Sequence, residues 1–202
     1  TIFTQMICTL ISSTASAIIQ KSEEGYMRKI IWLTFILTLG IITGCDRSNN
    51  ERPFKSKIGV GSPAPDFTLR DMNERNITLS GYKGKVVFIT FWNMKCKDCT
   101  ESMQSLEALN RRFGGQGLIV IAINADNLEY VKPEKIINFI KAKEYTFNVL
   151  FDETFSASET YKVVAIPMTF LIDGHGIISY IEFGKADWTS RENIERIQNL
   201  LN

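Results

Sequence analysis

The chain has 202 residues, of which 45% are hydrophobic and 22% charged, and its formal net charge is +1. A charge this close to zero argues against a nucleic-acid-binding surface. Four cysteines and a single histidine are present, which are few ligands for a structural zinc site.

The first recognisable segment is predicted to be an export signal. Met27 begins a short basic region, and the thirteen residues 30–42 that follow it are mostly apolar. This run is too short for a comfortable membrane span but suits the core of a signal peptide. It ends in ITGC at residues 42–45, which resembles the bacterial lipoprotein signal in which the cysteine, here Cys45, is lipidated and becomes the mature N-terminus. The next residue, Asp46, resembles an inner-membrane retention signal.

An uncleaved anchor helix is the alternative interpretation of the same segment. Under either interpretation the domain that follows faces outward, where disulfides persist. We therefore expect a location on the extracytoplasmic (periplasmic) face of the bacterial cytoplasmic membrane, with residues 27–44 as the signal peptide.

Residues 1–26 precede this signal and begin with Thr. We expect them to come from a reading frame extended beyond a true start at Met27, with a disordered leader as the alternative, because secretory signals stand at the N-terminus. In the first case Cys8 is absent from the cellular protein. Residues 45–57 are polar and indicate a tether, which leaves residues 58–202 as one domain.

The first half of the domain alternates between strands and a helix. Short extended segments at 64–69 and 77–79, on the two sides of the polar turn at 71–75, predict a hairpin. The β-branched and aromatic residues 86–92 predict a buried strand, and the unbroken apolar run 118–123 predicts a strand covered on both faces. A helix between them is stopped by the glycines of 114–117. Its apolar face consists of Met103, Leu106, Leu109 and Phe113.

The second half adds two helices and three strands. Pro133 opens a helix with apolar residues at 136, 137, 139 and 140, and residues 147–151 are a further strand candidate. Residues 168–172 and 177–183 predict a hairpin across a DGHG turn, and Arg191–Leu201 predicts the last helix. This succession predicts an α/β domain with a central mixed sheet flanked by helices.

One CxxC motif, Cys96 to Cys99, lies where the first central strand passes into its helix. Cys96 is therefore expected at the helix N-terminus, where the macrodipole and unpaired N–H groups favour a thiolate. Cys99 lies one turn further along, close enough to attack a mixed disulfide. A zinc site would need more ligands than His175 can add, and a structural disulfide closing so short a loop adds little stability. Redox chemistry is the favoured use.

Several short motifs follow one another in a distinctive order between Ile58 and the C-terminus. They are APDF at 64–67, GKVV at 84–87, FW at 91–92, CxxC at 96–99, YxV at 161–163 and IPMTFLID at 166–173. Together they resemble the TlpA/ResA branch of extracytoplasmic thiol-disulfide oxidoreductases. This resemblance implies a thioredoxin-like fold with an N-terminal hairpin and a central insertion.

The resemblance also implies roles for individual residues. Cys96 is the expected nucleophile and Cys99 resolves the mixed disulfide. The Ile166–Pro167 bond is expected to be cis, to face the disulfide and to present the Ile166 backbone to an extended substrate; an ordinary trans proline at a strand start is the alternative. Trp92 either shields the disulfide or is a core indole.

Charged residues around the motif are candidates for tuning it. Lys95 and Lys97 flank Cys96 and would favour its thiolate, whereas Asp98 would oppose it. Simple solvation of both lysines on a loop is the alternative. Lys95 also stands where the family often has Trp.

Two acidic positions of the family are replaced in this chain. Ser102 stands where the family often has a Glu, and Thr90 corresponds to the buried Asp of thioredoxin. Glu101 is expected to be a solvated helix residue. We therefore predict that water, or Asp98 from the surface, takes the proton from Cys99 and returns it.

The leading functional hypothesis is a membrane-tethered reductant of protein disulfides, with a role in cytochrome c maturation. Its expected partners are protein disulfides and dithiols, a membrane thiol electron donor and, through a lipid anchor at Cys45, the membrane; no nucleic acid, metal or cofactor besides the redox disulfide is expected. A thiol oxidant or isomerase and a copper-binding metallochaperone are the alternatives. A peroxiredoxin would want Thr or Ser where Asn93 stands.

Overall fold

The computed structural model describes residues 58–202 of the chain. The predicted signal peptide, Cys8, Cys45 and the tether lie outside the described residues. Within residues 58–202 seven strands form one mixed sheet in the order β2-β1-β5-β4-β3-β6-β7. In this part of the chain no helix combines the length and the apolar character that crossing a bilayer requires.

The centre of the sheet consists of three parallel strands. They are β3 (Val86–Trp92), β4 (Leu118–Asn124) and β5 (Asn148–Phe151), and β4 pairs with both of the others. Every residue of β3 is buried. Parallel strands covered on both faces read as continuous apolar runs, which is why the sequence predicts β3 without ambiguity.

Two antiparallel hairpins extend this centre. On one side β6 (Met168–Ile172) pairs with β3 and continues into β7 (Ile178–Phe183). On the other side β1 (Thr68–Asp71) pairs with β5 and with β2 (Asn76–Thr78). Both hairpins were predicted.

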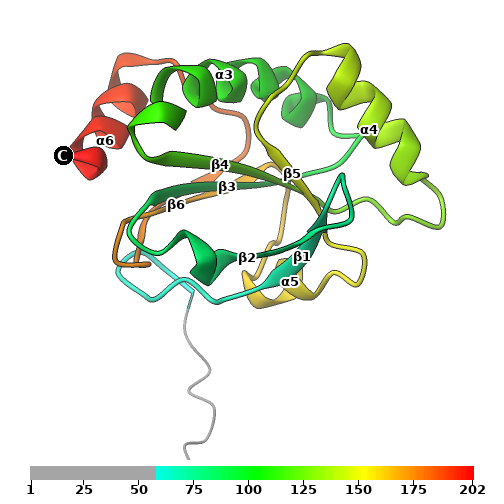
Figure 1. Cartoon of the computed structure of the whole chain (residues 1–202), viewed down its shortest axis with the longest axis horizontal. Coiled ribbons are helices and arrows are strands. Elements are labelled where there is room, and N and C mark those ends of the chain that lie inside the picture. The colour runs from blue at the N-terminus through cyan, green and yellow to red at the C-terminus, as the bar shows by residue number, and fades with distance from the viewer. Residues whose placement is uncertain (1–57) are drawn as a thin grey trace, which may run out of the picture. The chain divides into compact units, whose positions relative to one another are not determined.

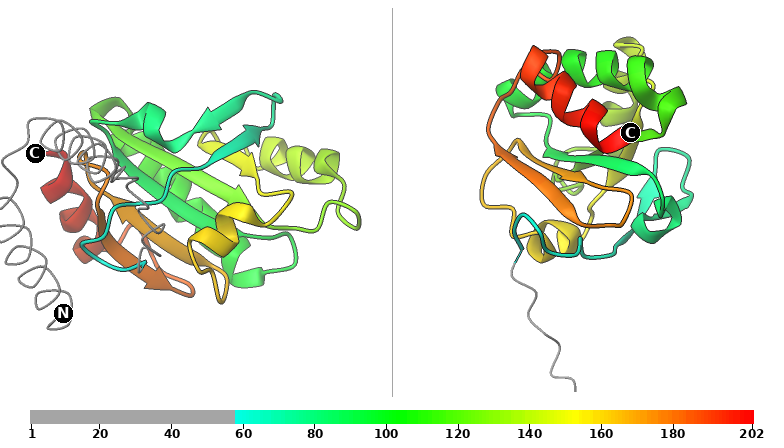
Figure 2. Two further views of the ribbon diagram at one scale, coloured as in Figure 1. Left: turned by 90° about the horizontal axis from the view of Figure 1, so that it is seen from below. Right: turned by 90° about the vertical axis from the view of Figure 1, so that its left-hand side faces the viewer.

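Helices cover the two faces of the sheet unequally. Figure 1 and Figure 2 show α3 (Lys97–Phe113), α4 (Pro133–Ala142) and α6 (Arg191–Leu201) on one face and the short α5 (Ser156–Thr160) on the other. The side chains of β3 alternate between these layers. Phe88 and Trp92 pack with α3 and α4, and Phe91 packs with Tyr161 beside α5. Thr90 belongs by the same alternation to the α3 face.

The sequence missed or misplaced two local features. The helix α5 was not predicted, because it has only five residues and is held by Asp152, whose carboxylate accepts from the backbone N–H groups of Ala157 and Ser158. Leu79 was expected to be extended but begins the 3-10 turn η1 (Leu79–Tyr82). The predicted stop of the helix at the glycines is confirmed: α3 ends at Phe113, and the 3-10 turn η2 (Gly114–Gln116) leads to Gly117, which has a positive φ.

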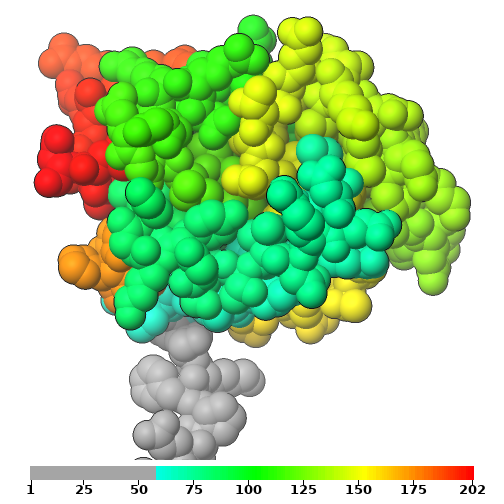
Figure 3. Space-filling model, in the orientation of Figure 1, coloured from blue at the N-terminus to red at the C-terminus, as the bar shows by residue number. Residues whose placement is uncertain are grey.

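Tyr161 holds the segment that leads into the N-terminal hairpin against the body of the domain. The Tyr161 hydroxyl donates to the Pro65 carbonyl over 2.7 Å. Burial raises the pKa of Tyr161 well above its usual range, so this hydroxyl stays a donor at any physiological pH. In Figure 3 the hairpin and η1, coloured from cyan to green, cover the lower front of the molecule.

Candidate active site

The two cysteines of the CxxC motif form a disulfide at the start of α3. The S–S distance is 2.01 Å and the Cα atoms are 5.2 Å apart. Cys96 is the N-cap residue, and its sulfur accepts the backbone N–H of Cys99 over 3.1 Å. An N-cap acceptor satisfies one of the helix's unpaired donors. The same donor would stabilise negative charge on the Cys96 sulfur after reduction.

Exposure distinguishes the two sulfur-bearing residues. Cys96 is half-buried, whereas Cys99 is only 2% exposed and belongs to the core cluster between the sheet and α3. A partner molecule can therefore approach Cys96, and Cys99 is reached only from inside the protein.

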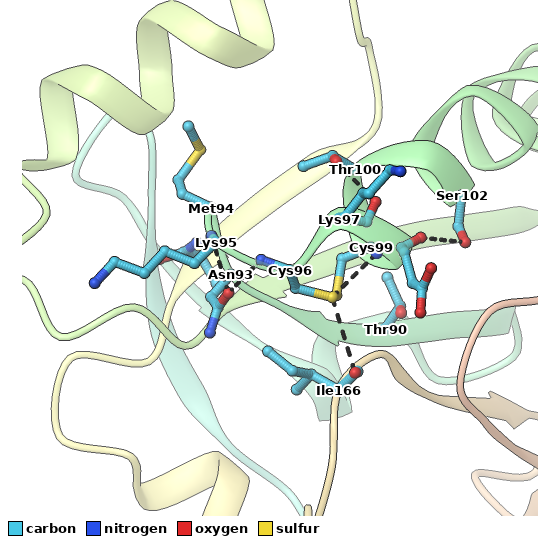
Figure 4. Close-up of a disulfide and its surroundings, with 12 residues drawn as sticks. Thr90, Asn93, Met94, Lys95, Cys96, Lys97, Cys99, Thr100, Ser102 and Ile166 are labelled. Atoms are coloured by element: carbon cyan, nitrogen blue, oxygen red, sulfur yellow. Dashed lines mark hydrogen bonds between the residues drawn. A yellow bond between two sulfur atoms is a disulfide. The ribbon is translucent and has the colours of Figure 1, made fainter.

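The segment before β6 lies opposite the disulfide. The Ile166–Pro167 bond is cis, as the resemblance implied. The Ile166 carbonyl oxygen lies 3.8 Å from the Cys96 sulfur, and Figure 4 shows it facing the disulfide. The Pro167 carbonyl accepts the Gly184 N–H over 2.8 Å, which ties this segment to the end of β7.

The loop that leads into the motif is held by residues that sequence reasoning missed. The Asn93 side-chain oxygen accepts from the backbone N–H groups of Lys95 and Cys96. The buried Asp126 carboxylate accepts from the Met94 N–H and from the side-chain amide of Asn124, each over 2.8 Å. Asp126 follows the end of β4, so only the fold brings it to this loop.

We expect Asp126→Ala to loosen the active-site loop. The substitution leaves the Met94 N–H and the Asn124 amide without their acceptor, and hydrogen bonds to charged groups contribute about 1.5–3 kcal/mol. Urea unfolding should show a loss of that order, and amide hydrogen exchange at Met94 should accelerate. Asp126→Asn, which keeps one acceptor oxygen, is the matched control and should lose less. Equal stabilities and exchange rates in all three proteins would contradict this role.

The charged residues near the motif lie on the surface. Lys95, Lys97 and Asp98 are exposed, and in Figure 4 the Lys95 side chain extends away from the disulfide. Lys97 forms a 3.7 Å ion pair with Glu101. Direct tuning of Cys96 by these lysines has no contact to support it, so solvation is the better interpretation of Lys95.

Glu101 is a surface residue, as expected, but it is paired rather than only solvated. Lys185, in the segment after β7, hydrogen-bonds its carboxylate. That hydrogen bond lowers the pKa of Glu101 and raises the pKa of Lys185. The pair therefore joins the first turns of α3 to the segment after β7 at the surface of the protein.

Behind Cys99 the structure brings together residues that the sequence could only place separately. Thr90, Ser102, Trp92 and Pro167 line one small cavity with Cys99. Trp92 is 1% exposed and packs 6.1 Å from the Phe139 ring. It is thus a core indole that lines the cavity behind Cys99.

His175 lies away from the cysteines. It lines a different cavity, of about 250 Å³, together with Ile172 at the far end of β6 from Pro167. Within residues 58–202 no group of three or more His, Cys, Asp or Glu side chains is arranged to hold a metal ion. The described residues therefore offer no partner histidine for a copper site at the CxxC pair.

Comparisons with known proteins agree with this geometry. The AhpC/TSA family model matches residues 60–181, more than half of the chain. The thiol-disulfide oxidoreductase ResA of Geobacillus kaustophilus is 30% identical over 177 residues, covering 88% of this chain and 95% of the relative. ResA of Bacillus subtilis is 30% identical over 165 residues, covering 82% and 88%.

Solved structures show the same fold. A candidate thiol:disulfide interchange protein DsbE from Chlorobium tepidum superposes with a TM-score of 0.65 at 26% identity, covering 72% of this chain and all of that one. The thioredoxin domain of a thiol-disulfide oxidoreductase from Bacteroides vulgatus gives 0.62 at 22% identity, again covering 72% and 100%. The fold is therefore thioredoxin-like, and the chain belongs to the ResA-like thiol-disulfide oxidoreductases of the AhpC/TSA family.

Proposed function

We propose that this oxidoreductase is a membrane-tethered, extracytoplasmic reductant of protein disulfides, serving cytochrome c maturation. In this proposal Cys96 is the nucleophile, Cys99 resolves the mixed disulfide, and a membrane thiol protein supplies electrons. Ile166 and Pro167 bind the extended segment of the substrate that carries its disulfide.

The observation that carries the proposal is the asymmetry of the cysteine pair. Cys96 is partly exposed and lies at the N-terminal donors of α3, whereas Cys99 is buried one turn further along. Reduced Cys96 attacks the substrate disulfide and displaces one substrate sulfur as a thiolate. Cys99 then attacks the Cys96 sulfur, the second substrate sulfur leaves, and the protein is left oxidised while the substrate is reduced.

The carbonyl of Ile166 supports the assignment of the substrate site. It lies 3.8 Å from the Cys96 sulfur, on a backbone segment that precedes β6. An extended chain that pairs with this backbone would place its own sulfur against Cys96, and main-chain pairing accommodates many sequences. This fits a substrate class defined by its disulfide.

The direction of electron flow is tested by the reduction potential. We expect the Cys96–Cys99 pair, equilibrated in glutathione or dithiothreitol buffers, to show a potential below about −200 mV, on the reducing side of protein disulfide isomerase. A value near about −120 mV, that of a strong oxidant, would contradict the reductant and favour the oxidant or isomerase. Cys99→Ser, which cannot form the pair, is the control for the assay.

Membrane attachment is proposed from the ITGC sequence at 42–45 and the apolar run before it. We expect Cys45→Ser to lose the acyl mass and to move from the membrane to the soluble fraction, because two acyl chains anchor a protein stably whereas none does. Fractionation of expressing cells and mass spectrometry of the purified chain measure both effects. Cys99→Ser, which removes a cysteine of the mature domain but keeps Cys45, is the control and should remain at the membrane; unchanged mass and retention in Cys45→Ser would rule out lipidation.

A further inference from the structure

The small cavity behind Cys99 is lined by polar residues that have no part in the exchange of disulfides between Cys96, Cys99 and the substrate. Its volume is about 10 Å³, and the residues with hydrogen-bonding side chains in its lining are Thr90, Thr169, Ser102 and Trp92, together with Cys99. Space of this size accommodates about one water molecule. Figure 4 shows Thr90 on β3 beneath the first turn of α3, next to the disulfide.

Two of these groups have a hydrogen to donate. Thr169 Oγ1 donates to Thr90 Oγ1 over 3.0 Å, across the pairing of β6 with β3. Because the Thr90 oxygen receives that bond, its own hydrogen has to find another acceptor. The indole Nε1–H of Trp92 is buried and has no hydrogen-bond partner among residues 58–202. An indole N–H can only donate, and leaving it unpaired is costly.

Two other groups can accept. The Ser102 hydroxyl donates its hydrogen to the Asp98 carbonyl over 2.8 Å, so its oxygen has lone pairs left for a further donor. The Cys99 sulfur becomes a strong acceptor when the disulfide is reduced and the thiolate forms. Two donors and two acceptors around a space of one water match the two lone pairs and two hydrogens of that molecule.

We propose that this cavity is a binding site for one water molecule, which accepts from Thr90 and Trp92 and donates to Ser102 and to the sulfur of Cys99. The inference rests on the proposed function, since Cys99 needs a donor in this position as the resolving thiolate. Its side chains are uncharged, whereas the family resemblance implies acidic residues at the positions of Ser102 and Thr90. Thr90 and Thr169 act through the water and are positioning residues.

The water contributes to the resolving step. The Cys99 thiol first passes its proton to the bound water, and from there the proton reaches solvent. Its thiolate then attacks the Cys96 sulfur of the mixed disulfide: the Cys96–Cys99 bond forms, the bond from Cys96 to the substrate sulfur breaks, and the electron pair leaves on the substrate as a thiolate. A hydrogen bond from the bound water favours the charged form of Cys99, so more of it is ready to attack at neutral pH.

The test measures Cys99 in the full chain with its other cysteines replaced by Ser. In this background the rate of iodoacetamide alkylation of Cys99 is followed against pH by mass spectrometry. Thr90→Val removes the donor but keeps the side-chain shape, and should raise the pH midpoint by about one unit. Thr169→Val should raise it less, and Thr90→Ser, which restores the hydroxyl, should return it to that of the parent.

A matched control exists at the opposite edge of the sheet. Thr68 and Thr78 form a cross-strand hydroxyl pair at 2.8 Å, the counterpart of the pair in the cavity. Thr78→Val should leave the Cys99 midpoint unchanged. A folded Thr90→Val protein with the parent's midpoint would overturn the proposal, as would an equal shift in Thr78→Val.

The water itself can be observed through Trp92. In reduced, ¹⁵N-labelled wild-type chain, the Trp92 indole N–H should show a cross-relaxation peak to a long-lived water, and Thr90→Val should weaken it. Absence of that peak in the wild type would overturn the water site. These readouts do not depend on turnover: if a chain lacking Cys96 still exchanged disulfides, the proposed function would fail while the water site stood.

Discussion

Replacing Cys96 by Ser is expected to abolish disulfide exchange completely. Serine has no sulfur with which to form a mixed disulfide, and Cys99, at 2% exposure, is not accessible to a protein substrate. The assay is reduction of a protein disulfide such as that of insulin, followed by turbidity or by thiol release. The fold should survive, because the Cys96–Cys99 bond closes a very short loop.

The Cys99→Ser variant separates the two roles. Cys96 would still attack the substrate, but no internal thiol would release it, so a mixed disulfide should accumulate and be visible as a reducible band of higher mass on a non-reducing gel. Cys96→Ser should show no such band. If the adduct instead accumulated in Cys96→Ser and not in Cys99→Ser, the assignment of nucleophile and resolving thiol would have to be exchanged.

The sequence predicted the frame of the site because its signals are local. The continuous apolar run of β3 and the spacing of Met103 and Leu106 on α3 place the helix N-terminus at Cys96 without any knowledge of the fold. Strand, motif and helix are consecutive in the chain. Their relative positions therefore follow from backbone geometry, and the structure agrees with them.

The supporting residues could not be predicted because their roles depend on tertiary contacts. Asp126 lies 32 residues from the Met94 N–H that it binds, and Thr169 lies 79 residues from Thr90. Single polar residues after a strand or within one are common, and nothing in their spacing names a partner. A polar residue inside an otherwise apolar strand, such as Thr90, was the one available signal, since buried polar groups are hydrogen-bonded.

The two positions at which this chain lacks the acidic residues of the family lie close together in the fold. Ser102 and Thr90 approach Cys99 from α3 and β3 and line the same cavity. With hydroxyls at both of these positions, no carboxylate lines the cavity behind Cys99. Asp98, the surface acid considered as a substitute, is exposed and meets this network only through its backbone carbonyl, which accepts from Ser102.

Restoring an acid with Ser102→Glu is therefore expected to have a large effect. The cavity, at about 10 Å³, is too small for a carboxylate, so the new side chain would displace the proposed water and crowd α3, at a cost of about 1–3 kcal/mol in stability. The negative charge of a carboxylate beside Cys99 disfavours the negatively charged thiolate and raises the pKa of the thiol. The alkylation midpoint of Cys99 should rise by about one unit or more, with about a tenfold slower reaction at neutral pH.

The matched control for Ser102→Glu lies one residue away on the outer side of α3. Glu101→Gln removes a carboxylate that pairs with Lys185 and Lys97 at the surface, and it should leave exchange rate and Cys99 midpoint close to those of the parent. Rate, midpoint and urea unfolding have to be measured on the same preparations, because strain and charge act together in Ser102→Glu. One result would contradict this account: Ser102→Glu leaves the exchange rate and the Cys99 midpoint unaltered, while Glu101→Gln strongly slows exchange. In that case Glu101 transfers the proton of Cys99 from the surface, and the uncharged residues behind the disulfide contribute only packing.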